Sequence, residues 1–140
     1  MPNIGSIITN AGTAVASRIT NAHAYEGPPD SVNQLPAVIV LLENFDPSIA
    51  FGGNSFEGTL RFIFLIERSE SGEAWRRLWT HLDVTGSGTS VIAALRADPR
   101  FGSAVDSSFV ARVENIGGRQ MMGGVYLGFD VLVPFVHTVA

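Results

Sequence analysis

Apolar side chains occupy every second position from Val125 to Phe135, and this alternation is the strongest constraint on the fold. Alternate residues of a β-strand project to the same face of a sheet, so such a run gives a strand one continuous apolar face. Another layer of the protein must cover that face, because apolar surface left in water forfeits the free energy of burial. The face consists of Val125, Leu127, Phe129, Val131, Val133 and Phe135.

A second long strand is predicted from Ser55 to Glu67, where the same period of two recurs. One face carries Phe56, Gly58, Leu60, Phe62, Phe64 and Ile66, and the other carries Glu57, Thr59, Arg61, Ile63, Leu65 and Glu67. Two shorter strands are predicted. The first covers 37–42, a wholly apolar run, and the second covers 108–116, which alternates again. The segments 45–54 and 117–124 are predicted to be connections.

Three helices are predicted from apolar residues spaced three and four apart. The first spans 4–20, with Asn3 as its N-cap. The second carries the stripe Trp75, Leu78, Trp79 and Leu82. The third begins at Ser90 and ends before Pro99, because a proline disfavours the helical conformation in the residue that precedes it. This order predicts a single α+β domain over residues 1–140, with a mainly antiparallel sheet and with the N-terminal helix and the two further helices packed on one face.

Composition excludes several classes of function. The chain has no cysteine, which excludes thiol catalysis, cysteine-ligated zinc and disulfides. All nine cations are arginine and thirteen acids leave a net charge of -4, whereas proteins that grip DNA by its phosphates carry a basic surface. No apolar run reaches the roughly 18 residues of a membrane span, and the N-terminus lacks the basic region of a secretory signal. We therefore expect a cytoplasmically made protein that binds neither membrane nor specific nucleic acid.

The glycine-rich stretch GSGTSVIAALRADPRFG (86–102) raises the question of a phosphate-binding loop. A Walker-type loop needs a lysine after its second glycine and a preceding strand, and the chain has no lysine and a predicted helix there. The dinucleotide fingerprint fails too, because Ile92 and Ala93 stand where its third glycine would lie. The favoured interpretation is a chain reversal at Gly86 and Gly88, followed by a helix that Thr89 or Ser90 caps.

No catalytic constellation stands out among the titratable residues. The histidines, His23, His81 and His137, are scattered, and His81 has no histidine or carboxylate at helical spacing for a metal. Solvated or sheet-edge histidines are the favoured interpretation. A Ser-His-Asp triad stays open, since its members need not be neighbours in sequence, although no G-x-S-x-G motif occurs. We predict no enzyme activity and assign no catalytic, metal-binding or cofactor-binding residue.

Apolar residues in the predicted connections form the candidate assembly interface. Large apolar side chains there lie beside glycines, where an isolated domain would carry polar residues. Only 16% of the residues are charged, which favours a surface that is partly covered in the working state. Alternatively, these side chains fold back over the core. The candidate interface residues are Phe45, Ile49, Phe51, Arg119, Met121 and Met122.

The segment LDVTGSGTSVIAALRADPRFGSAVDSSFVARVENIG, followed by GGVYLGFDVLVPFV, resembles the tail terminator proteins of long-tailed, non-contractile bacteriophages. That family has a serine helix start, an AL helix, a D-P/T-x-x-G ending, a strand, and a closing Y-L-G-x-x-x-x-V strand. Here these are Ser90, Ala94-Leu95, Asp98-Pro99, Gly102 and Tyr126-Leu127-Gly128. The upstream LPAVIVLLEN (35–44) also looks like the family's first strand. The likeness spans residues 1–140, and its motifs mark fold positions rather than chemistry.

The resemblance implies a structural virion protein. It implies a ring, usually of six copies, on the head-proximal end of a finished tail tube, where the ring stops tube polymerisation and meets the head–tail connector or stopper protein. The partners implied are other copies of the chain, the tail tube protein and the connector, and the genomic DNA would pass through the lumen unbound. An acidic subunit without lysine fits that passage, because like charge repels DNA.

Two alternatives stay open from the residues. One is another head–tail neck protein, such as the head-completion stopper or a minor tube-like subunit, for which a pattern dominated by β-barrel strands would be expected. The other is a small α+β enzyme or ligand-binding domain, which requires converging polar groups in a pocket. The strands offer only Glu57, Arg61, Arg112, Glu114 and Asp130 for such a pocket.

Overall fold

Two long antiparallel strands form the centre of the sheet in this computed structural model, which describes residues 4–25, 27, 34–46, 55–68, 71–84, 88–121 and 124–138. The elements follow in the order α1 (Ile4–Ala16), β1 (His23–Tyr25), β2 (Ala37–Asp46), β3 (Ser55–Glu67), α2 (Gly72–Leu82), α3 (Val91–Ala97), β4 (Ser107–Ser108), β5 (Arg112–Met121) and β6 (Gly124–Thr138). Together they form an α+β fold, as the alternation and the helical spacings predict.

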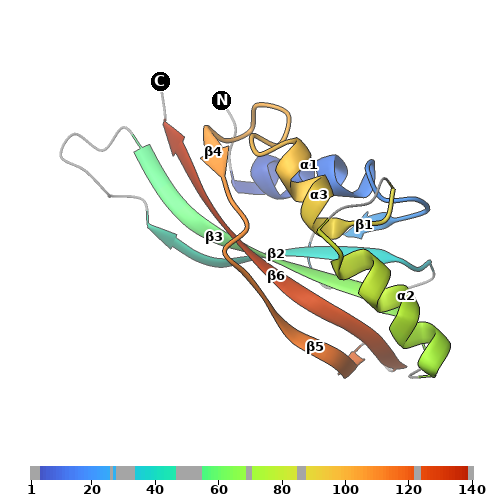
Figure 1. Cartoon of the computed structure of the whole chain (residues 1–140). Coiled ribbons are helices and arrows are strands. Elements are labelled where there is room, and N and C mark those ends of the chain that lie inside the picture. The colour runs from blue at the N-terminus through green and yellow to red at the C-terminus, as the bar shows by residue number, and fades with distance from the viewer. Residues whose placement is uncertain are drawn as a thin grey trace.

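The sheet has the strand order β1-β2-β3-β6, and β4 and β5 both pair with the outer side of β6. Short β1 lies parallel to β2, and the other pairs are antiparallel. The central pairing of β3 with β6 sets Phe62 opposite Val131 and Phe64 opposite Phe129. In Figure 1, β3 and β6 run the whole length of a strongly twisted sheet. β5 lies beside the lower half of β6, and β4 lies beside its upper half.

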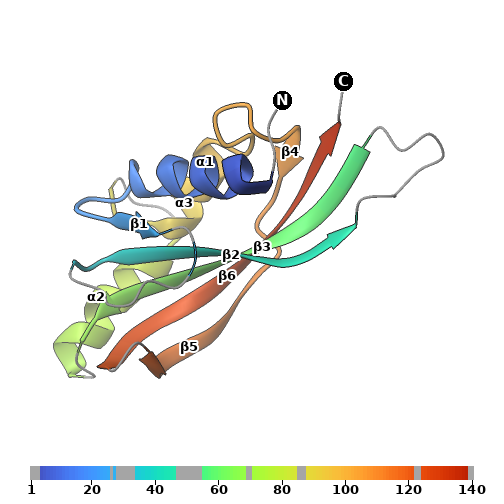
Figure 2. The same ribbon diagram turned by 180° about the vertical axis from the view of Figure 1, so that it is seen from behind.

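All three helices lie on one side of the sheet, where the main core forms (Figure 2). The aromatic rings of β3 and β6 fill the centre of this core: the ring centroids of Phe64 and Phe129 are 5.2 Å apart. Fully or nearly fully buried residues from the helices complete it: Ile7, Ala11 and Val15 of α1, Ala74 and Leu78 of α2, and Val91, Ala94 and Leu95 of α3. We refer to the two sides of the sheet as the helix face and the helix-free face.

The helices differ in detail from the sequence prediction. Helix α1 ends at Ala16 instead of residue 20, and Ile19 is buried in the turns that follow. Asn3, the expected N-cap, lies outside the described residues. On α2 the predicted apolar stripe is wrong in part, because Trp79 remains 52% exposed while Ala74 and Leu78 take the buried positions. The Trp79 ring packs on that of Trp75, at a centroid distance of 5.2 Å, instead of on the sheet.

The predicted strand over 108–116 is divided in the structure. Only Ser107–Ser108 and Arg112–Met121 are strands. Ser108 lies opposite Phe135 and Arg112 lies opposite Leu132, so the register with β6 shifts by one residue between the two strands. Most of the predicted connection 117–124 is strand instead, since β5 pairs with β6 as far as Met121 opposite Gly124. Half-exposed Val125 at this end of the hairpin is not part of the core, unlike the rest of its predicted face.

The close approach of β3 and β6 depends on Gly128. A Cβ atom on Gly128 would lie 2.0 Å from the carbonyl oxygen of Phe64 and 3.2 Å from the Cα of Leu65, so backbone would have to move. The pairing of the two strands is irregular here, because Leu65 lies opposite Gly128 while Glu67 already lies opposite Leu127. The glycine therefore makes the contact between the central strands possible.

Gly128→Ala is expected to lower the free energy of unfolding by about 3 kcal/mol or more, since overpacking against backbone cannot be relieved by a side-chain rotation. The measurement is urea unfolding followed by circular dichroism. Gly72→Ala is the matched control: a Cβ there meets nothing within 4 Å at the start of α2, so it is expected to be neutral or to stabilise by up to about 1 kcal/mol. Equal effects of both changes would contradict the argument.

Candidate assembly surface

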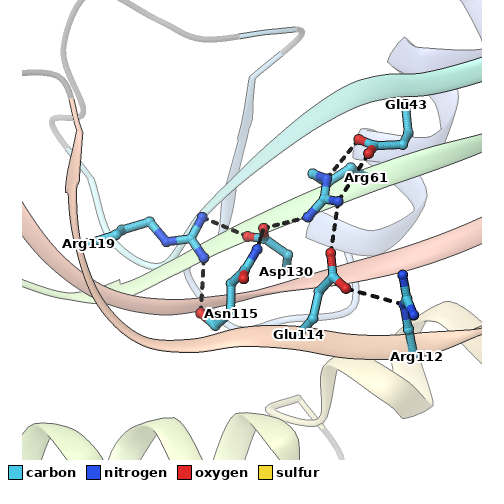
Figure 3. Close-up of polar contacts among 7 residues, drawn as sticks. All are labelled: Glu43, Arg61, Arg112, Glu114, Asn115, Arg119 and Asp130. Atoms are coloured by element: carbon cyan, nitrogen blue, oxygen red, sulfur yellow. Dashed lines mark hydrogen bonds and ion pairs between the residues drawn. The ribbon is translucent and has the colours of Figure 1, made fainter.

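The helix-free face of the sheet holds a buried carboxylate, Asp130, in the middle of β6 (Figure 3). Its side chain is only 4% exposed. Arg61 Nη1 lies 2.7 Å from Oδ2, and the side-chain amide of Asn115 donates to the same oxygen at 2.9 Å. Arg119 Nη1 lies 2.7 Å from Oδ1, as an ion pair without hydrogen-bond geometry. Two arginines thus compensate one buried negative charge.

Arg61 on β3 connects this carboxylate to two others. Its guanidinium contacts Glu43 of β2 at 2.8 and 3.1 Å, and Nη2 lies 2.8 Å from Glu114 Oε1 on β5. The hydrogen bond to Glu43 is the main reason why the pKa of Arg61 is raised above its ordinary value, and it lowers the pKa of Glu43. A bidentate arginine–carboxylate pair of this kind fixes geometry as well as charge. The network therefore ties together the side chains of β2, β3, β5 and β6.

An irregularity in β5 brings Asn115 and Arg119 to Asp130. The register places Glu114 opposite Asp130 and Gly117 opposite Gly128, so β5 has one residue more than β6 in this interval. Asn115 takes φ 55° and Gly117 takes φ 140°. Asparagine tolerates the left-handed region better than most side chains. Arg119 Nη2 then donates to the Asn115 carbonyl at 3.0 Å, which closes the loop of contacts.

The network is suited to holding strands together, and its charges neutralise one another. Of the five polar strand residues singled out in the sequence, four belong to it, namely Arg61, Arg112, Glu114 and Asp130. Arg61 and Arg112 also line an open hollow of about 410 Å³. Glu57 lies apart, near the Thr138 end of β6. Within the described ranges no group of three or more histidines or carboxylates could hold a metal.

The candidate interface residues have different positions. Phe45, near the end of β2, is 40% exposed, and its ring packs edge-on against Phe56 at a centroid distance of 5.3 Å. Arg119 belongs to the ion-pair network. Met121 is the last residue of β5, and its side chain is outside the described part of the structure. Ile49, Phe51 and Met122 also lie outside the described residues.

The glycine-rich stretch contains a helix cap. Ser90 Oγ accepts a hydrogen bond from the backbone N–H of Ala93 at 3.0 Å and donates to the carbonyl of Asp83. Gly88 takes φ 80°, a conformation that favours glycine. Ser90, rather than Thr89, is therefore the capping residue, and α3 ends with Asp98 as its C-cap, as predicted. Residues 85–87 lie outside the described part.

The histidines are dispersed, but one of them is not solvated. His23 is exposed and His81 is partly exposed. His137 is buried on β6, which lies between β3 and β4, and this corrects the expectation of a solvated or sheet-edge side chain. Its ring packs against Phe56 at a centroid distance of 5.3 Å. Its Nδ1 atom is 3.7 Å from the carboxylate of Asp106. The predicted strand stops short of this residue; β6 continues to Thr138, so the alternation extends one step beyond Phe135 and places His137 on the helix face.

Several exposed apolar residues lie in regular structure or beside it, outside the connections in which an interface was predicted. They include Phe109, which is 65% exposed, as well as Ile116, Val125 and Val136. Phe109 follows β4, and its backbone N–H bonds the carbonyl of Pro134. The alternation assigned Phe109 and Val113 to one face, but the one-residue shift between β4 and β5 sends Val113 to the core and Phe109 to the helix-free face. No pattern in the sequence marks that shift.

Arg61→Met is expected to lower the free energy of unfolding by about 3 kcal/mol, because it leaves the Asp130 carboxylate buried with less compensation. Arg112→Met is the matched control: its side chain is 66% exposed and forms an ion pair with Glu114, so the loss is expected to stay below about 1 kcal/mol. Urea unfolding of the two variants measures the difference. Similar losses in both would show that the Asp130 network behaves as an ordinary surface ion pair.

The described part of the chain contains no helix that is long and apolar enough to cross a membrane. A scan against models of known protein families finds no match to this chain, and a search of curated proteins finds no similar sequence.

Proposed function

We propose that the protein is a structural virion subunit, a tail terminator. In this proposal it forms a ring, of six copies, on the head-proximal end of a phage tail tube, stops elongation of the tube and joins the tail to the head–tail connector or stopper protein. The proposal takes its family from the sequence resemblance. The observation that supports it is that large apolar side chains are exposed, whereas the charges of the Asp130 network neutralise one another.

The exposed apolar residues are of the kind that protein interfaces contain, which fits a surface that other chains cover. Phe45 and Phe109 lie near the same end of the sheet, and large exposed aromatic side chains are typical anchors of protein interfaces. Scattered single apolar residues are common on monomers, but several that line one hollow are not. This arrangement supports an assembly subunit.

Charge supports the proposed role in the virion. The subunit carries a net charge of -4 and no lysine, so genomic DNA that passes through the lumen of such a ring would meet repulsion rather than binding. Two of its nine arginines, Arg61 and Arg119, are committed to the buried Asp130. The partners proposed are other copies of the chain, the tail tube protein and the connector, without cofactor or membrane.

The test is a tube-length assay. The tagged protein is used to recover its partners from a lysate of its source, and the tube-forming subunit found there is polymerised with and without the protein. Tubes of limited length with a ring at one end, seen by electron microscopy, are expected. Tubes whose length does not change would overturn the terminator proposal. Recovery of connector proteins without any effect on tubes would favour another neck protein, and retention of a small molecule would favour a ligand-binding domain.

Phe51→Asp and Met122→Asp are expected to abolish ring formation on the tube while leaving the melting temperature nearly unchanged, because a charge in an interface is costly only when a partner covers it. Differential scanning calorimetry and the tube-length assay give the two readings. Phe62→Asp is the control for a core position, since Phe62 is fully buried and this variant is expected to unfold. Unfolding of the first two variants as well would assign them to the core.

A further inference from the structure

A small apolar pocket of about 210 Å³ lies between α3 and the connection from β4 to β5. The core residues Leu95 and Val133 are part of its lining, and so is Val110, which packs against the main core. Phe109, whose side chain is 65% exposed, forms another part of the wall. Sites that enclose a whole drug-sized ligand measure roughly 300–1,000 Å³. The group that fits this smaller pocket is therefore a single apolar side chain.

Hydrogen bonds hold the walls of this pocket in place. Ser108 Oγ donates to the carbonyl of Pro99 at 2.7 Å, which ties β4 to the segment after α3. The backbone N–H of Phe109 donates to the carbonyl of Pro134 at 3.2 Å. A site whose walls are already ordered loses less conformational entropy when it binds.

Arg96 brings a positive charge to the same pocket. It lies in the last turn of α3, it is exposed, and it belongs to the lining. It makes no hydrogen bond or ion pair within the part of the chain that the structure describes, and none of the described residues that line the pocket is acidic. A guanidinium bonds a carboxylate at two points. The pocket is therefore complementary to an apolar group with a carboxylate close to it.

The backbone of Val110 is open to a partner as well. The N–H groups of Phe109 and Ala111 donate to carbonyls of β6, so the N–H of Val110, which lies between them, points away from β6. No hydrogen bond among the described residues reaches the N–H or the C=O of Val110. Strands β4 and β5 form an edge of the sheet here (Figure 1). An extended peptide can both donate and accept at such an edge, whereas a free carboxylate can only accept.

We propose that this pocket anchors an extended segment of a partner protein, in which an apolar side chain and a carboxylate lie two residues apart. The apolar side chain fills the pocket, the carboxylate pairs with Arg96, and the backbone of the segment bonds Val110. The spacing of two follows because alternate residues of an extended chain point to the same side, and Leu95 and Arg96 both reach the pocket from α3. The inference goes beyond the terminator proposal and does not depend on it.

The test uses a synthetic peptide, acetyl-Gly-Thr-Leu-Thr-Asp-Thr-Gly-amide, in an NMR titration of the backbone amide signals. A saturable shift that includes the Val110 amide is expected. The same peptide with asparagine in place of the aspartate is expected to bind about tenfold more weakly, because a charge-assisted pair becomes a neutral hydrogen bond. With alanine in place of the leucine, binding is expected to fall by about tenfold or more, because less apolar surface is buried.

Arg96→Met is expected to weaken binding of the leucine–aspartate peptide by about tenfold and to remove the difference between the aspartate and asparagine peptides. Arg96→Lys is expected to restore part of the affinity, since it keeps the charge without the planar group. Arg76→Met is the matched control, because Arg76 is exposed on α2 and lies outside the pocket. It is expected to bind like the wild type.

Three results would overturn the assignment: a titration without a saturable shift at Val110, an asparagine peptide that binds as tightly as the aspartate peptide, or an Arg96→Met variant that binds like the wild type. The free acid 4-methylpentanoate is titrated as well. If it binds as tightly as the peptide, the occupant is a small carboxylate instead of a partner segment. The tube-length assay reports separately on the terminator proposal.

Discussion

The antiparallel pairing of β3 with β6 determines where every other element lies. The register holds along nearly the whole length of both strands, with one irregularity at Leu65, where Gly128 allows the backbones to approach. On the helix face this pairing aligns the phenylalanine rings against which the three helices pack. On the helix-free face it brings Arg61 beside Asp130. Both the core and the polar network are consequences of one pairing of two strands.

Asp130 shows how the polar network depends on that pairing. A carboxylate in the middle of a central strand is expensive to bury, and the structure offsets this cost with two arginines and an amide from neighbouring strands. Because these groups come from β3 and β5, the network also favours one register over its neighbours: a slip by one residue would move the partners to the opposite face. A buried charge here specifies the alignment of strands more than it adds stability.

The fold class and the central strands were predictable because alternation and helical spacing are local properties of the chain. The cap at Ser90 and the helix end before Pro99 were predictable for the same reason. The extension of β5 through 117–121, the exposure of Trp79 and the shift at Phe109 were not, since each depends on which residues lie opposite on another strand or helix. Of the candidate interface, Phe45 is 40% exposed and also packs on Phe56, so it combines the two alternatives that the sequence left open. The position of Arg119 beside Asp130 depends on the register of β5 with β6, which the sequence does not show.

The position of β6 in the chain order affects how the protein can be made. This strand pairs with β3, β4 and β5, yet it follows all of them. At roughly 5–20 residues per second, a ribosome needs several seconds to deliver β6 after β3 has emerged. During that time the phenylalanine face of β3 has no cover from its main partner. Until β6 is made, this face and the unpaired edge of β3 are exposed, and such surfaces make an incomplete chain prone to aggregate.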